Sequence, residues 1–165
     1  MKNTALTTGA AALILAVGLA GHFASGAIYS SVEARDMISA LSSPALYLGS
    51  AIAASASTTL ALMLTLLGLV RRADAEFDPQ MYRQIYRIAV LSTILLAGAV
   101  VMLLLMTMPI GEFDDVPGSW FPMLYNVLYW IVVVLSAGLV AMVTMLFGTV
   151  RSLIAKLTPH DDVYM

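Results

Sequence analysis

Cysteine is absent from this chain, and charged residues are scarce. The lack of cysteine excludes disulfides, thiolate nucleophiles, and zinc–thiolate or iron–sulfur ligation. Charged residues make up 11% of the chain, whereas soluble domains carry about 25%. Hydrophobic residues make up 61%, and the mean hydropathy is +0.92. A water-soluble fold of 165 residues has too little interior to hide this much apolar surface, so lipid is the predicted solvent.

Catalytic and nucleotide-binding signatures are also lacking. The sequence contains no H-E-x-x-H, P-loop or dinucleotide-binding motif. No serine in the hydrophobic stretches has a plausible histidine–carboxylate partner. We therefore expect no enzymatic activity, no catalytic residue, no cofactor and no metal site. The net charge is −2, and the basic residues flank hydrophobic stretches, which argues against nucleic acid as a partner.

Four long stretches of the sequence contain no formal charge. A hydrocarbon core about 30 Å thick requires ~20 apolar helical residues to cross it, and each stretch is long enough. We therefore predict an all-α protein with a single domain, an integral membrane bundle of four transmembrane helices. The domain covers 1–165, and the expected spans are about 4–31, 44–70, 86–109 and 122–150. A cleaved secretory signal is the alternative for the first stretch, because Lys2, an apolar run and small residues at 25–27 follow that pattern.

Prolines and polar turns indicate where the helices begin and end. The polar residues 33–36 predict a tight external hairpin, after which the second helix starts near Pro44. Asp78 followed by Pro79 is typical of an N-cap with proline in the first helical position, so the third helix is expected to begin there. The last helix is expected from near Pro122 to about residue 157, which is longer than a bilayer requires.

The basic residues predict an orientation. Short cytoplasmic loops collect Lys and Arg, and seven of the eight such residues fall on one side of the predicted bundle. They are Lys2, Arg71, Arg72, Arg83, Arg87, Arg151 and Lys156. Both termini are therefore expected in the cytoplasm, and a bacterial inner membrane is the expected location. On the other side, Glu112, Asp114 and Asp115 form a candidate acidic outer mouth that would concentrate cations; ordinary hydrophilic loop composition is the alternative.

His22 is the one histidine within the four charge-free stretches, and ionisable groups at such depth are costly in lipid and often functional. On a helical period, Gly26, Tyr29 and Glu33 share its face. If several copies of the first helix surrounded an axis, this face would line an ion path with a ring of carboxylates at its mouth. The alternative is a neutral His22 that hydrogen-bonds a neighbouring helix, with Glu33 paired to Arg35.

The second hydrophobic stretch carries a row of small and hydroxyl residues at helical spacing. The candidate packing residues are Ser50, Ala54, Ser57 and Ala61. Small side chains let helix backbones approach closely, and hydroxyls can bond across helices. A helix-packing face, in the bundle or in an oligomer, is the first interpretation. A hydrated path is the second, because serine and threonine tolerate water.

These patterns favour a small homo-oligomeric channel or transport protein, most plausibly for cations, with the first helix lining the path. Its expected partners are the lipid bilayer, further copies of the chain and a small cation. The alternative is a non-transporting membrane subunit or scaffold that associates with other membrane proteins. A haem- or quinone-linked redox subunit is a third hypothesis, and it depends on His22.

As an analogy of layout, the chain resembles the Orai family of calcium channels. The shared features are four helices with cytoplasmic ends, a basic segment before the third helix, and a long final helix. Short sequence echoes accompany them: Met81-x-Arg83-x-Ile85 before Ser92-Thr93, Arg151-Ser152-Leu153, and Glu33. The resemblance implies a pore-lining first helix with a selecting glutamate at its outer end. The chain departs from that family by lacking a long basic start to the first helix and by carrying His22 in the span.

Overall fold

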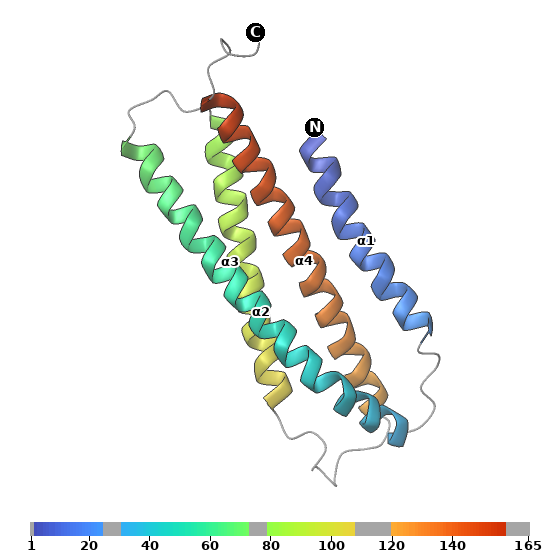
Figure 1. The fold of residues 1–165 in the computed structure, drawn as a ribbon. Helices are drawn as coiled ribbons and strands as arrows, with labels where there is room; N and C mark the ends of the chain where they lie inside the picture. The colour runs from blue at the N-terminus through green and yellow to red at the C-terminus, as the bar shows by residue number, and fades with distance from the viewer. Residues whose placement is uncertain (1, 25–30, 73–78, 108–119, 158–165) are drawn as a thin grey trace.

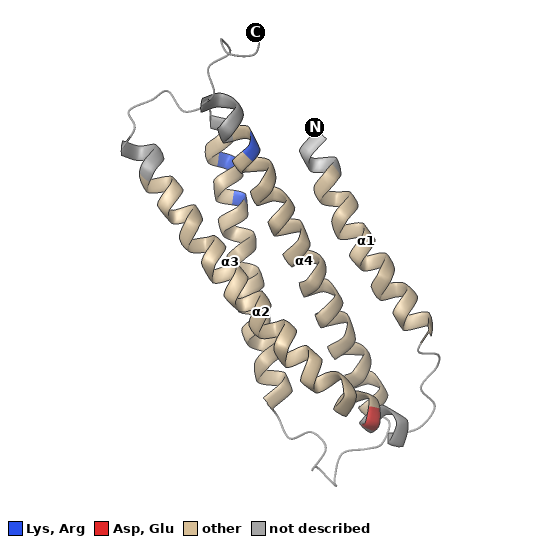
Figure 2. Cartoon of the chain, viewed as in Figure 1, with Lys and Arg blue, Asp and Glu red and all other residues tan. Residues whose placement is uncertain are grey.

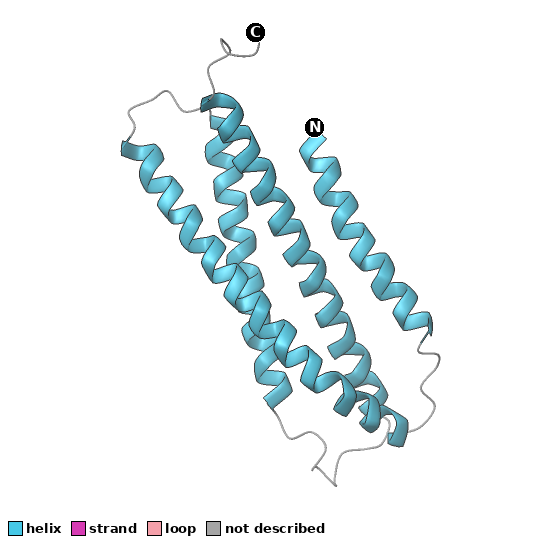
Figure 3. Cartoon of the chain, viewed as in Figure 1, coloured by secondary structure: helices cyan, strands magenta, loops and turns pink. Residues whose placement is uncertain are grey.

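A computed structural model describes residues 2–24, 31–72, 79–107 and 120–157, and these residues form helices that run alternately in opposite directions (Figure 1). The helices are α1 (Lys2–Ala24), α2 (Ser31–Arg72), α3 (Pro79–Thr107) and α4 (Trp120–Leu157). All of the described residues are helical (Figure 3), which confirms the all-α prediction for this part of the chain. Each of the four helices contains a segment long and apolar enough to cross a membrane.

The beginning of α2 differs from the prediction. The helix starts at Ser31 and continues through Pro44, so residues 33–36 belong to its first turns and do not form the expected hairpin. A proline inside a helix removes one backbone donor and crowds the carbonyl four residues earlier. Such prolines are tolerated in membrane helices, where neighbouring groups compensate. At 42 residues, α2 is about 63 Å long, so its ends extend beyond a bilayer core.

The boundaries of α3 and α4 follow the sequence closely. The third helix begins at Pro79, as the first-turn proline predicts. The fourth begins at Trp120, two residues before Pro122, and ends at Leu157 as expected. Its 38 residues span about 57 Å. Both helices are therefore longer than a hydrocarbon core of about 30 Å requires.

The core of the bundle lies among α2, α3 and α4. The side chains of Ile52, Ile88 and Met102 are fully buried there. Gly138 lets α3 and α4 approach closely, since a Cβ at this position would lie 2.6 Å from Cδ2 of Leu95. The hydroxyl of Ser92, also fully buried, donates to the carbonyl of Ile88 (2.8 Å). The same hydroxyl also contacts Sδ of Met142 on α4 (3.2 Å). Close packing and contacts of this kind between helices hold a bundle together in lipid.

The first helix is peripheral to this core. Only 6% of its apolar segment is buried, compared with 22% in α2 and 28% in α3 and in α4. It packs along α4, on the side of the bundle away from α2 (Figure 1). Most of the surface of α1 would therefore face lipid or another chain.

Charge is segregated between the two ends of the bundle. The basic side chains that the structure describes lie near the start of α3 and the end of α4, whereas Asp36 lies near the start of α2 at the opposite end (Figure 2). The start of α1 lies at the basic end as well (Figure 1). This arrangement is the one that the predicted topology requires, with Lys and Arg concentrated on a single side.

Candidate functional site

His22 lies against α4 of the same chain. Its ring is half-buried, with its centroid 5.8 Å from that of Trp130 and 6.0 Å from that of Tyr129. The ring of its neighbour Phe23 is 6.2 Å away. The single histidine of the predicted span is therefore part of an aromatic cluster between two helices. In this position it does not present an open face to an axis formed by several copies of α1.

Two glycines bring α1 close to α4 beside this cluster. A Cβ at Gly18 would lie 2.5 Å from Cγ1 of Val133, and one at Gly21 would lie 2.6 Å from the hydroxyl oxygen of Tyr129. That hydroxyl donates a hydrogen bond to the carbonyl of Gly18 (2.7 Å). Sequence analysis did not single out this contact. The signal was present in the Gly18-x-x-Gly21 spacing, which places two small residues on one helix face.

The other members of the predicted α1 path do not join His22. Gly26 and Tyr29 lie outside the described residues. Glu33 belongs to the first turn of α2, whereas α1 ends at Ala24, so the helical period of α1 does not extend to it. Its role in an ion path stays a prediction. The candidate acidic mouth, Glu112, Asp114 and Asp115, also falls outside the described residues, and it stays a prediction.

The predicted packing residues of α2 are exposed on the outer side of the bundle. They are Ser50, Ala54, Ser57 and Ala61. They do not pack against another helix of the same chain, because α2 turns Ile52, Ala56 and Met63 toward its neighbours. The prediction of a packing face therefore stands for contacts with another chain, which the structure of a single chain does not test.

The exposed row continues along α2 in both directions. Thr65 and Gly68 extend it toward one end, as the helical period predicts, and Asp36, Ser39 and Ser43 extend it toward the other end, beyond the exposed Tyr47. We call the residues that extend the row, together with the four named above, the α2 polar face. A polar row along the lipid-facing side of a membrane helix lacks the apolar contacts that lipid favours, so a face of this kind is typical of contacts with protein or water.

The hydroxyls of the α2 polar face use their protons on their own helix. Three of these side chains donate to a backbone carbonyl three or four residues earlier: Ser50 to Tyr47 (2.8 Å), Ser57 to Ala53, and Thr65 to Ala61 (2.9 Å). The neighbouring exposed Thr58 donates in the same way to Ala54 (2.8 Å). A hydroxyl has one proton and two acceptor lone pairs. The face therefore offers oxygen acceptors outward, which suits cations or donors and not anions.

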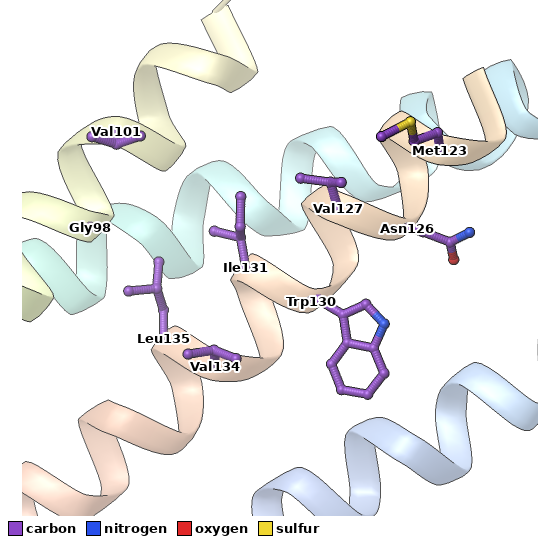
Figure 4. A pocket seen from close by; sticks show the side chains of 9 residues that line it. All are labelled: Gly98, Val101, Met123, Asn126, Val127, Trp130, Ile131, Val134 and Leu135. Atoms are coloured by element: carbon purple, nitrogen blue, oxygen red, sulfur yellow. The ribbon is translucent and has the colours of Figure 1, made fainter. Parts of the chain in front are cut away.

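A second surface feature is a groove of about 860 Å³ between α3 and α4 (Figure 4). Its walls are almost entirely apolar, with Gly98 and Val101 from α3 opposite Val127 and Ile131 from α4. The carboxamide of Asn126 and the indole of Trp130 are its polar elements. Figure 4 shows the Trp130 ring directed toward α1, where it meets His22. The lining suits hydrocarbon, and no helical period of the sequence indicated it.

Among the described residues, no three His, Asp or Glu side chains come together in a way that could hold a metal ion. Comparison of the chain with protein-family models, with curated proteins and with solved structures finds no match.

Proposed function

We propose that this chain is a multi-pass protein of a bacterial inner membrane, with both termini cytoplasmic. In this proposal several copies assemble with their α2 polar faces toward a common axis and conduct small cations along it. The segregation of described charges between the two ends of the bundle supports the orientation (Figure 2). The four apolar helices support the membrane location.

The α2 polar face is the observation that carries the proposal. In lipid, an exposed row of hydroxyls gains nothing from its surroundings, whereas a second copy of the chain or a file of water molecules can use its oxygen acceptors. The helices of one chain pack too closely among themselves to enclose a hydrated path, because the centre is filled by Ile52, Ile88 and Met102. Symmetric assembly supplies a path without changing the fold of the single chain.

The proposed path differs from the one expected from sequence, which ran along α1. The His22 face of α1 is turned to α4, while the polar face of α2 is open. Asp36 lies near the start of α2, so assembly around α2 would place a ring of carboxylates at one mouth. Such rings favour cations over anions.

Cation flux into liposomes tests this function. Ser57→Ala combined with Thr65→Val removes two oxygens of the face with little change in volume. We expect several-fold lower flux, because fewer acceptors would replace the hydration shell of the ion. Thr93→Val is the matched control: Thr93 is exposed on α3 and also donates to its own helix, at the carbonyl of Ala89 (3.0 Å). Equal effects of both changes, or no flux from the wild-type protein, would contradict the proposal.

The assembly can be tested separately because the chain has no cysteine. A cysteine introduced as Ala54→Cys lies on the α2 polar face and should form a disulfide between copies in membranes. Ala97→Cys, exposed on α3, is the control and should form little. Cross-linking that is equal at the two positions would argue against an α2-centred oligomer.

A non-transporting subunit or scaffold is the second candidate. The hydrogen bonds that the α2 hydroxyls donate to their own helix favour this function. Because each hydroxyl proton already has a carbonyl acceptor, a helix of another protein can cover the face without leaving an unpaired donor. In that case a different membrane protein would copurify with the chain in fixed stoichiometry under mild detergent. Its copurification would depend on Ala54, and Ala54→Leu should abolish it while Ala97→Leu does not.

A further inference from the structure

A small pocket with mostly apolar walls and a polar rim lies at the basic end of the bundle, where α1, α3 and α4 converge. Its volume is about 190 Å³. Thr7 and Thr8 line it from α1, Gln84, Arg87 and Ile88 from α3, and Met145, Gly148 and Thr149 from α4. The pocket is separate from the α2 polar face, because no residue of α2 contributes to the described lining.

The lining combines apolar walls from Ile88 and Met145 with two exposed donor side chains, Gln84 and Arg87. The guanidinium of Arg87 is a planar fork of donors that matches phosphate oxygens, and the Gln84 carboxamide can add a further hydrogen bond. Apolar walls beside such donors suit a phospholipid, which carries acyl chains next to its phosphate. No carboxylate lines the pocket among the described residues. Asp36, the acidic residue whose side chain the structure describes, lies at the opposite end of the bundle (Figure 2). Arg83 lies one helical turn from Arg87 and adds positive potential.

The depth of the pocket points to a lipid as the source of the phosphate. The pocket lies among the first three turns of α3, which carry Arg83 and Arg87, and the last turns of α4, which carry Arg151. In membrane proteins arginines near helix ends extend toward the interface, so the pocket lies at the level of phospholipid headgroups. Basic pockets between helices on the cytoplasmic side are known to hold anionic headgroups.

We propose that this pocket binds the headgroup phosphate of an anionic phospholipid. The lipid would join the start of α1 to α3 and α4 at a point far along the helix from the Gly18–Tyr129 hydrogen bond. This role suits a helix of which only 6% of the apolar segment is buried. The proposal does not depend on ion conduction, and it uses no residue of the α2 polar face.

Native mass spectrometry of the full-length protein tests the proposal by measuring the affinity for phosphatidylglycerol added after delipidation. Arg87→Gln should weaken retention about tenfold, because it removes charge-assisted hydrogen bonds. Arg83→Gln changes the net charge equally and should weaken it less than about twofold. Arg87→Lys should recover part of the loss. Circular dichroism of each variant checks that the helices are intact.

The other outcomes are distinguishable. Equal losses for Arg83→Gln and Arg87→Gln would mean general attraction to a basic surface and would overturn the pocket. Equal retention of zwitterionic phosphatidylcholine by the wild-type protein would overturn the preference for anionic lipid. Inorganic phosphate that displaces the lipid at low concentration would show a site for soluble phosphate and would overturn the lipid assignment.

Discussion

α1 and α4 are both apolar enough to cross a membrane, yet they occupy their places in the bundle for different reasons. The α4 helix is held on several sides, with Leu128 and Met142 fully buried against its neighbours. The α1 helix is held mainly along one side, by the close approach at Gly18 and the hydrogen bond from Tyr129. Hydropathy therefore indicates which segments can enter a membrane, whereas small residues and complementary shape decide which helices pack closely.

This contrast bears on how the molecule works. Because α1 packs mainly on α4, we expect that it can be displaced without unfolding the other three helices. The α2–α3–α4 core contains most of the fully buried side chains, and the α2 polar face lies on its outer side. Substitutions that destabilise α1 but not the α2–α3–α4 core, or the core but not α1, therefore test this difference in packing.

The largest expected effect concerns the core. Ile52→Ala removes a side chain that is 0% exposed between α2 and its neighbours, and the cavity should lower the free energy of unfolding by about 2–5 kcal/mol. Leu13→Ala removes a similar volume from α1 at a position 62% exposed, and it should cost about 0.5 kcal/mol or less. Reversible unfolding in mixed micelles measures both. Similar costs would mean that α1 is packed as tightly as the core.

The second prediction concerns a substitution that should weaken the contact between α1 and α4. Gly18→Val places a branched side chain where a Cβ already meets Val133 at 2.5 Å, and overpacking of this kind costs about 1–3 kcal/mol. Spin labels at the exposed positions 12 and 143 should then report a broader α1–α4 distance distribution. Gly9→Val is the control, since nothing lies within 4 Å of its Cβ position. An unchanged distribution for Gly18→Val would refute the glycine contact.

The smallest expected effect is the loss of one hydroxyl. Tyr129→Phe removes the donor to the Gly18 carbonyl and should cost about 0.6 kcal/mol, the average for hydrogen bonds between membrane helices. Tyr47→Phe, at a side chain 77% exposed, should be neutral. The same unfolding assay compares them. A cost above that of Gly18→Val would indicate that the hydrogen bond, and not the close approach, holds α1.

Several features of the fold could be predicted because their causes are local. The proline at position 79 correctly indicated the start of α3. The start of α2 was misjudged because a lone proline also suits the interior of a long membrane helix, where other groups compensate for the lost donor. Helix geometry alone placed Ser50 and Ala54 on one face, and that face exists. Its exposure was not predictable, since it depends on which side of α2 meets α3.

The candidate site also has features that were predictable from local sequence and features that depend on how the helices pack. His22 was recognisable as an unusual residue from its place in an apolar stretch, but its partner rings lie on α4, more than a hundred positions away in the sequence. The pocket at the basic end forms only where three helices meet, and this brings together Thr7, Arg87 and Thr149, which are far apart in the sequence. A pattern confined to one helix does not carry that information.

The sequence by itself determined how many segments are long and apolar enough to cross a bilayer, and that the basic residues flank these segments. These properties follow from the cost of placing charges and unpaired backbone groups in hydrocarbon, a cost that adds up residue by residue. The tertiary structure alone decided that α1 stands at the edge, that the α2 polar face lies outside, and that Arg87 shares a pocket with Thr7. In lipid, contact between two apolar helix faces gains little free energy over contact with lipid. Close packing between segments that are distant in the sequence therefore decides which helices lie together.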